Sequence, residues 1–341
     1  DLPYFSGYEG MPLERLTLLV VPVDDDAKLL IPALEASRVI ERPEVFHLIP
    51  WSDGEDPIDK ASQIIGSVET VAIDDQMWSG FLIDFLSTLP KARFLRASEA
   101  TIPIRSIKDS SEIEALRAAG KAVDRVVADI QRGDVSLVGR TEFEVANQIG
   151  QRILEEGHRK INFVIVASGP NAASPHHEPG NRVIKANEGV LFDFGGTMDD
   201  AHGVGYCSDI TRCVYTGEPS DEFLTLYNIL FDAQKAGVNA AIVGTSCEEV
   251  DTVTRSVISE AGFGDYFIHR TGHGIGVEAH EHPNIVVGNT QPLVSGHAFS
   301  IEPGIYLPGH LGMRLEDIVV CTETGPDRMN QADRSLVIVG S

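Results

Sequence analysis

RTGHGIGVEAHEHP, from Arg270 to Pro283, is the stretch that decides how this chain can fold. Gly272, Gly274 and Gly276 would each cost helix stability, so we expect irregular or extended backbone here. That excludes the helical zinc motif, in which two histidines one turn apart bind the ion. His273 lies between two of these glycines, where a ligand or a metal ion can approach its ring closely. The alternative is a polar loop with one hydrogen-bonded histidine.

The composition predicts a globular protein with an acidic surface. A length of 341 residues predicts two domains. The chain is 43% hydrophobic, which predicts a sizeable core, and its 51 acidic and 27 basic residues give a formal net charge of −24. Such a surface repels phosphate backbones and anionic membranes, so we expect no nucleic-acid or membrane partner. No apolar run is long enough for a membrane span, and no signal-peptide pattern opens the sequence.

The chain has four cysteines, at positions 207, 213, 247 and 321. They are too sparse for a disulfide scaffold and lack zinc-type pairing, which favours a reducing, cytoplasmic setting. Cys207 and Cys213 alternate in phase with Asp209 and are expected on the same face of one strand. We interpret them as packing residues, with metal ligation as the alternative.

Residues 1–105 are predicted to form a small α/β domain that supports the rest of the chain. Short β-rich apolar runs are expected to be strands at 15–23, 44–51 and 68–75. Leu29–Ser37 and Gly80–Leu89 are rich in alanine and leucine and are expected to be helices. Thr101–Lys108 is expected to link this domain to a second one, residues 106–341.

Four helices with clear end signals are predicted in the second domain. Thr141 with Glu144, and Ser246 with Glu249, form capping boxes, and Asp109 begins a further capping segment. Glycines are expected to close three of the helices. The expected spans, from cap to last residue, are 109–130, 141–157, 220–237 and 246–262.

These features repeat at a steady offset. The two capping boxes are 105 residues apart, His176 and His280 are 104 apart, and Asp209 and Glu316 are 107 apart. Helix caps alone recur by chance, but histidines and acids placed in parallel favour a duplicated unit. The sequence therefore predicts two helices followed by strands, twice over.

Four acids and one histidine in this region are candidate metal ligands: Asp193, Asp209, His273, Glu302 and Glu316. Each acid interrupts an apolar run that otherwise belongs in a core. One such acid is usually an edge residue or is paired with a nearby arginine or lysine. Burying four together is prohibitive unless cations lie among them.

Charge balance favours a pair of metal ions. Two divalent ions would cancel four carboxylates, with a neutral imidazole completing the set. Metals roughly 3.5–4 Å apart need bridging carboxylates and share a water whose lowered pKa makes a hydroxide nucleophile available. Oxygen-rich ligands with one nitrogen favour manganese, cobalt, iron or zinc over a thiolate site.

These motifs resemble the pita-bread metallopeptidases, the family of methionine aminopeptidase, aminopeptidase P and prolidase, over residues 107 to about 325. The resemblance implies an α/β (α+β) fold. A small N-terminal α/β domain would precede a pita-bread domain with an internal pseudo-two-fold repeat. It also implies that Asp193 chelates one metal and that Asp209 and Glu316 bridge both. His273 and Glu302 would bind the second metal.

The resemblance implies further roles. Glu302 would take a proton from the metal-bridging hydroxide and pass it to the leaving nitrogen. His176, His269 and His280 match substrate-site histidines that would orient the substrate and stabilise the oxyanion. The alternative is that these three histidines only fill the core. Arg314 matches a substrate-site arginine two residues before the bridging glutamate.

The resemblance also narrows the activity. Methionine aminopeptidase normally lacks an N-terminal domain, and creatinase-like members lose the ligands that are retained here. GHGIGVEAHEHP looks closest to bacterial prolidases. We therefore expect hydrolysis of Xaa-Pro bonds, which most peptidases cannot cleave, in dipeptides, with manganese favoured among the metals. Aminopeptidase P activity on longer peptides and a catalytically inactive binding module are the alternatives. Short proline-containing peptides and a second copy of the chain are the partners that the resemblance implies.

One departure from the family concerns the spacing of Asp193 and Asp209, which is longer here than is usual. The extra residues fall in the turn-like stretch 196–203. We expect a longer hairpin tip that keeps both ligands in register. The alternative is that Asp199, Asp200 or His202 points into the substrate cleft and affects substrate length.

Overall fold

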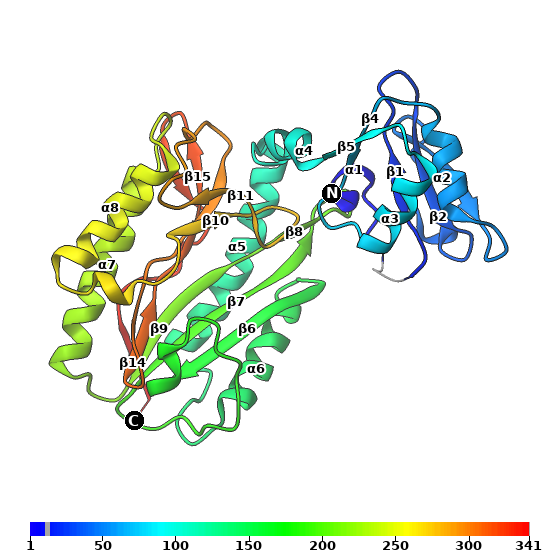
Figure 1. Ribbon diagram of the computed structural model, residues 1–341. Helices are drawn as coiled ribbons and strands as arrows, with labels where there is room; N and C mark the ends of the chain where they lie inside the picture. The colour runs from blue at the N-terminus through cyan, green and yellow to red at the C-terminus, as the bar shows by residue number, and fades with distance from the viewer. Residues whose placement is uncertain (11–13, 341) are drawn as a thin grey trace. The chain divides into compact units, whose positions relative to one another are not determined.

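The computed structural model describes residues 1–10 and 14–340 (Figure 1). The chain forms two compact units, Asp1–Ile104 and Arg105–Ser341. Among the described residues, no helix combines the length and the apolar character that crossing a membrane requires.

The first unit is a small α/β unit built on two separate groups of strands. Strand β2 (Ala27–Pro32) pairs antiparallel with β1 (Leu18–Val20) and parallel with β3 (Phe46–Trp51). Strands β4 (Thr70–Ile73) and β5 (Arg93–Arg96) form a parallel pair. The helices are α1 (Leu2–Ser6), α2 (Pro57–Ile65), α3 (Ser79–Thr88), α4 (Ser98–Arg105) and a short 3₁₀ helix, Ala36–Arg38.

One helix prediction for this region is wrong. Leu29–Ser37 is not a helix, because its first residues belong to β2. Leu30 packs in one apolar cluster while Leu29 and Ile31 pack in another, so both faces of this central strand are buried. A strand buried on both faces is apolar throughout and loses the alternation that identifies a strand. Thr101–Lys108, the predicted link, contains the boundary between the two units, and its first residues are helical because α4 continues to Arg105. The helix predicted at Gly80–Leu89 is confirmed as α3.

The second unit contains two successive groups of helices and strands. The first group comprises α5 (Ser110–Gln131), α6 (Glu142–Glu155), β6 (Lys160–Ser168), η2 (Gly169–Ala173), β7 (Gly189–Asp199), β8 (Gly205–Cys207) and β9 (Ile210–Thr216). The second comprises α7 (Asp221–Ala240), α8 (Cys247–Glu260), η3 (Gly264–Tyr266), β10 (Gly272–Gly274), β11 (Glu281–Ile285), β12 (Ala298–Ile301), β13 (Gly304–Leu307), β14 (Leu311–Arg314), β15 (Asp317–Thr322), β16 (Gly325–Arg328) and β17 (Val337–Val339).

Each group contributes most of its strands to one sheet covered by its own helix pair (Figure 1), while β13 and β14 form a separate two-stranded sheet and β17 joins the sheet of the first group. The first sheet has the order β17-β9-β7-β6, and β8 pairs with β7; the second has the order β11-β10-β12-β15-β16. Val127 of α5 and Ile149 of α6 pack against Phe192 of β7. In the second group Val250 of α8 packs against Phe299 of β12. The predicted duplication of two helices followed by strands is confirmed.

Helices α5 to α8 begin at the residues that the sequence predicted. Asp109, Thr141, Ser220 and Ser246 are the N-caps of α5, α6, α7 and α8, and the first, second and last of these complete capping boxes. The predicted end of α7 at Gly237 is wrong, since the helix continues to Ala240. A Cβ atom at position 237 would lie 2.3 Å from Oγ1 of Thr254 in α8. Glycine here permits close packing of two helices rather than ending one.

Candidate active site

The predicted ligands come from both sheets. Asp193 lies within β7, directly opposite Thr211 of β9, and His273 is the central residue of β10. Glu302 follows the last residue of β12, and Glu316 lies between β14 and β15. Asp209 lies in the gap between β8 and β9.

Asp209 was predicted within a strand, and that prediction is wrong in detail. The backbone leaves the strand at Ser208, whose N–H donates to Gly196 O at 2.9 Å and whose Oγ accepts from Gly196 N at 3.1 Å. A Cβ atom at Gly195 would lie 2.0 Å from Ser208 O, so β7 needs a glycine to admit this bend.

The bend also separates the two cysteines that were expected on one strand face. Cys207 packs beside Tyr206 and Ile275, whereas Cys213 packs in the cluster that contains Leu191. Both thiols are free and buried, and burial raises the pKa of each to about 11. These properties agree with packing rather than metal ligation.

Three of the predicted ligands form a compact cluster. Asp209, His273 and Glu316 each place one potential ligand atom so that all of these atoms lie within 4.8 Å of one another. All three residues are buried. Glu302 joins them through His273, whose Nε2 lies 3.2 Å from Oε1 of Glu302 and 3.8 Å from Oδ2 of Asp209.

The ring of His273 is oriented by its own backbone environment. Its Nδ1 lies 3.0 Å from the carbonyl oxygen of Gly274, and a carbonyl can only accept, so the proton of a neutral ring belongs on Nδ1. The lone pair of Nε2 therefore faces the carboxylates. A histidine that donates one N–H to a carbonyl and presents the other nitrogen has the arrangement of a metal ligand.

Two carboxylate oxygens of the candidate ligands lack a partner in the described part of the chain, which fits a cation site. Oδ1 of Asp193 and Oδ1 of Asp209 are buried and have no hydrogen-bond partner within residues 1–10 and 14–340. Burial, and then the charge of Glu316, raise the pKa of Asp209 well above its usual value. Burial, and then the charge of Glu302, do the same for Glu316. Carboxylate oxygens and one imidazole nitrogen are a donor set for divalent metal ions.

Glu302 behaves differently from its neighbours. Burial favours its neutral form, but when the ring of His273 is charged, its hydrogen bond and charge, together with the charges of His269 and Arg314, outweigh burial and lower the pKa of Glu302 to about 2. Ser300 Oγ donates to Oε1 of Glu302 at 2.9 Å and accepts from the backbone N–H of His273 at 3.0 Å. Ser300 thus holds both groups in one orientation.

Arg314 is buried beside Asp193 rather than open to the substrate. Its Nη2 donates to Oδ2 of Asp193, and its Nε donates to Thr211 Oγ1 at 3.2 Å. Its Nη1 donates to the hydroxyl of Tyr306 at 2.7 Å and to Pro175 O at 3.2 Å. Four of its five N–H groups thus have acceptors among the described residues, so only one N–H of Nη2 is left for a direct contact with the substrate.

The three predicted substrate histidines gather around the same cluster. The ring of His280 lies 4.0 Å from that of His273, and burial, followed by the charges of His273 and Arg270, lowers the pKa of His280 to about 4. His269 donates from Nδ1 to Arg270 O at 2.7 Å, which leaves Nε2 to accept from Tyr306 at 2.9 Å. His176 is exposed, and its charge also lowers the pKa of His280.

Tyr306 and Thr211 were missed by the sequence analysis. The Tyr306 hydroxyl connects Arg314 with His269, and Thr211 Oγ1 donates to Oε2 of Glu316 at 2.7 Å. Nothing in the sequence marked Tyr306 as a site residue, because an aromatic residue in an apolar strand normally belongs to the core. For Thr211 there was a weak indication in the sequence, since it lies two residues after the candidate ligand Asp209.

The long connection between Asp193 and Asp209 is an extended hairpin of β7 and β8, as expected. Asp199 forms an ion pair with Arg159, with 2.6 Å between Oδ1 and Nε. The carboxylate of Asp200 accepts from the backbone N–H groups of His202 and Val204 within its own turn. His202 is exposed. Both carboxylates thus stabilise the hairpin, which favours a local role over a place in the substrate cleft.

Known proteins are similar to this chain over nearly its whole length. Residues 114–323 match metallopeptidase family M24, and residues 1–107 match the creatinase/prolidase N-terminal domain. A probable dipeptidase, PepE, of Mycobacterium tuberculosis is 40% identical over 99% of this chain and 90% of its own length.

Solved structures of dipeptidases and prolidases have the same fold as this chain. Dipeptidase PepE from Mycobacterium ulcerans superposes with a TM-score of 0.92 at 39% identity, covering 100% of this chain and 91% of the other. A prolidase from Thermococcus sibiricus gives 0.90 at 37% identity, covering 100% and 92%. The predicted mixed α/β fold, an N-terminal domain followed by a pita-bread domain, is confirmed. The chain belongs to metallopeptidase family M24.

Proposed function

We propose that this metallopeptidase hydrolyses Xaa-Pro bonds in dipeptides with the help of two divalent metal ions. The observation that carries the proposal is the convergence of buried carboxylates on one imidazole nitrogen, with two carboxylate oxygens that lack hydrogen-bond partners. The similarity to dipeptidases and to a prolidase supports the substrate class. Short proline-containing peptides are therefore the proposed partners.

The proposed ligands are Asp193, Asp209, His273, Glu302 and Glu316. Asp193 is assigned to one ion, His273 and Glu302 to the other, and Asp209 and Glu316 to both. Ions bound there would supply a water of lowered pKa and a Lewis acid for the peptide carbonyl. Manganese is the first metal to test, followed by cobalt, zinc and iron, because the donors are mostly oxygens.

Glu302 is the proposed proton carrier. Its ionised carboxylate can accept a proton from water, and transfer of that proton to the proline nitrogen would let the amine leave. Ser300 Oγ holds Oε1 of Glu302, so the second oxygen is the one we assign to proton transfer.

His176, His269 and His280 are proposed to orient the peptide and to stabilise negative charge on its carbonyl oxygen. With a pKa of about 4, His280 is neutral near pH 7 and can donate one N–H. We propose that Arg314 lies at the edge of the substrate site and acts on the substrate through the hydroxyl of Tyr306, to which it donates a hydrogen bond. Its ion pair with Asp193 partly neutralises its positive charge.

A substrate comparison tests the proposal. The purified protein, loaded with manganese, is assayed on an Xaa-Pro dipeptide and on the matching Xaa-Pro-Yaa tripeptide. We expect faster turnover of the dipeptide. Cleavage of the tripeptide alone would identify an aminopeptidase instead. Failure to cleave either peptide with manganese, cobalt or zinc would favour an inactive binding module.

A homodimer in a reducing, cytoplasmic compartment completes the proposal. The four cysteines are free and buried, which is compatible with such a compartment. Sedimentation equilibrium across a range of protein concentrations would decide whether the chain is a monomer or a dimer.

A further inference from the structure

A buried arginine behind the candidate metal site has all of its donors occupied. Arg212 of β9 is 2% exposed. Its Nε donates to Asp333 O, its Nη1 to Thr211 O and Glu316 O, and its Nη2 to Asp317 Oδ1 and Ala332 O, at 2.5 to 3.0 Å. A guanidinium carries five N–H groups, so each has an acceptor.

Glu316 depends on these contacts because it lies outside the paired strands. The β13–β14 ladder ends at Arg314, and the β12–β15 ladder begins at Asp317. The backbone N–H of Glu316 donates to Thr211 O at 3.2 Å, and its carbonyl accepts from Arg212 Nη1 at 2.5 Å. Both backbone groups of this candidate ligand are therefore held by β9, which belongs to the other half of the unit.

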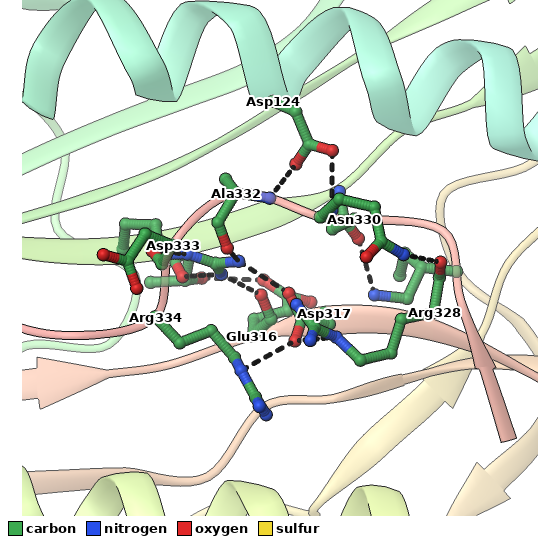
Figure 2. A network of polar contacts seen from close by, with 12 residues as sticks. Asp124, Glu316, Asp317, Arg328, Asn330, Ala332, Asp333 and Arg334 are labelled. Atoms are coloured by element: carbon green, nitrogen blue, oxygen red, sulfur yellow. Dashed lines mark hydrogen bonds and ion pairs between the residues drawn. The ribbon is translucent and has the colours of Figure 1, made fainter.

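The surrounding network fixes the guanidinium itself. Figure 2 shows Asp317 between Arg328 and Arg334, with Asp124 contacting the C-terminal segment, residues 329–335, from the opposite side. Asp317 is fully buried, and its Oδ2 lies 2.9 Å from Arg328 Nε. The carboxylate of Asp124, on α5, accepts from Gln331 N and Ala332 N, which holds the Ala332 carbonyl in place for Arg212.

The contacts of Arg212 indicate a geometric role. Two of its five hydrogen bonds reach the backbone of β9 and of Glu316, and two reach the C-terminal segment. Its one carboxylate partner is Asp317, not a candidate ligand. The guanidinium that contacts a candidate ligand side chain is Arg314, through Asp193.

We propose that Arg212 is a positioning residue for the metal site. By bonding the carbonyls of Thr211 and Glu316, it sets the position of the Glu316 carboxylate relative to Asp209 and His273. The inference rests on the proposed metal site and adds a residue to it. Arg212 acts through the shape of its guanidinium, which a lysine with the same charge cannot reproduce.

Two variants separate shape from charge. R212K keeps the positive charge and loses the planar, five-donor guanidinium. R328Q removes a positive charge from the same Asp317 carboxylate and leaves the contacts to Glu316 intact. Metal-free protein of each variant and of the wild type is titrated with Mn²⁺ by calorimetry, and the visible spectrum of bound Co²⁺ reports the coordination. Circular dichroism confirms that each variant is folded.

R212K is expected to bind Mn²⁺ about 10- to 100-fold more weakly than the wild type, with an altered Co²⁺ spectrum, as for the loss of a group that orients a ligand. R328Q is expected to lose much less Mn²⁺ affinity than R212K, because it leaves the guanidinium of Arg212 and its hydrogen bonds to Thr211 and Glu316 in place. Wild-type affinity in R212K, or an equal loss in R328Q, overturns the proposal.

If R212K does not fold, D124N replaces it, because Asp124 lies at the outer end of the same network and is partly exposed. A weaker loss of Mn²⁺ affinity is then expected, and an unchanged affinity overturns the proposal. Peptide hydrolysis plays no part in this readout. A protein that binds metal but cleaves no Xaa-Pro bond would end the proposed dipeptidase activity without affecting the role of Arg212.

Discussion

Nε2 of His273 lies 3.2 Å from Oε1 of Glu302, and that same oxygen accepts a hydrogen bond from Ser300 at 2.9 Å. One carboxylate oxygen is thus held by two neighbours. The lowered pKa of Glu302 keeps the group ionised, while burial and like charges raise the pKa of Asp209 and Glu316. The acids of one cluster therefore differ in proton affinity, as is needed if one of them carries a proton while the others bind metal.

Glu302→Gln is expected to reduce turnover of an Xaa-Pro dipeptide by about 100-fold or more, because an amide cannot accept the proton that a general base takes. The rate is measured with saturating manganese, so that weaker metal binding is not mistaken for lost proton transfer. Glu323→Gln, an exposed acid on the same unit, is the control and should keep the wild-type rate. A near-normal rate for the Glu302 variant would remove this residue from the mechanism.

Metal binding is expected to stabilise the folded protein, because it compensates buried carboxylates that otherwise repel one another. At a free Mn²⁺ concentration of 100 times its dissociation constant, the gain is about 2.7 kcal/mol. Thermal unfolding with and without Mn²⁺, and after addition of a chelator, measures it. Glu316→Gln should show a much smaller shift. An equal shift would place the bound ion elsewhere.

His280→Ala is expected to lower kcat/KM for the dipeptide, since its ring lies beside that of His273, tilted by 54° at a centroid distance of 4.0 Å. His282→Ala is the matched control, because His282 lies two residues away and is exposed. Steady-state kinetics of both variants tests the proposed substrate role. Equal kinetics for the two variants would show that His280, which is exposed like His282, takes no part in substrate binding or catalysis.

His158 is expected to make the protein less stable as the pH falls below about 6.5. Its ring is buried with Nε2 2.8 Å from Ser208 Oγ, and burial, with a smaller contribution from the charge of Arg125, lowers its pKa to about 4. Between these pKa values the unfolded chain binds a proton that the folded chain does not, so stability is lost as pH decreases.

At pH 5 this loss amounts to about 2 kcal/mol relative to pH 7. Urea unfolding of metal-free wild type and His158→Gln at both pH values measures it. Taking the difference between the two proteins cancels the contribution of the carboxylates. The variant should lose less stability than the wild type by about that amount, and parallel curves would show that His158 is protonated in the folded state.

Gly237→Ala is expected to destabilise the protein by about 1–3 kcal/mol, because the added Cβ would lie 2.3 Å from Thr254 Oγ1 and 2.9 Å from Ile301 Cγ2. Gly80→Ala is the control, since a Cβ atom there meets nothing within 4 Å and alanine favours a helix. Denaturant unfolding compares the two. A neutral effect at position 237 would mean that α7 and α8 can move apart without cost.

Several features could be predicted because they depend on neighbours along the chain. Capping boxes such as Thr141 with Glu144 involve residues three apart, and they begin helices where expected. The steady offset between the halves also lies in the sequence, and it corresponds to two sheets with their own helix pairs. The helix predicted over Leu29–Ser37 failed because burial on both faces of β2 comes from other segments.

The sequence by itself determined which side chains are available to a metal: four acids in apolar surroundings and a histidine between glycines. Only the tertiary structure decided their spacing, and with it the parts of Tyr306 and Arg212. The Tyr306 hydroxyl bonds to His269, 37 positions earlier in the chain, and Arg212 holds a carbonyl 104 positions away. Contacts of this kind leave no local pattern, because the hydrogen bonds that fix them form only after segments far apart along the chain have folded against each other.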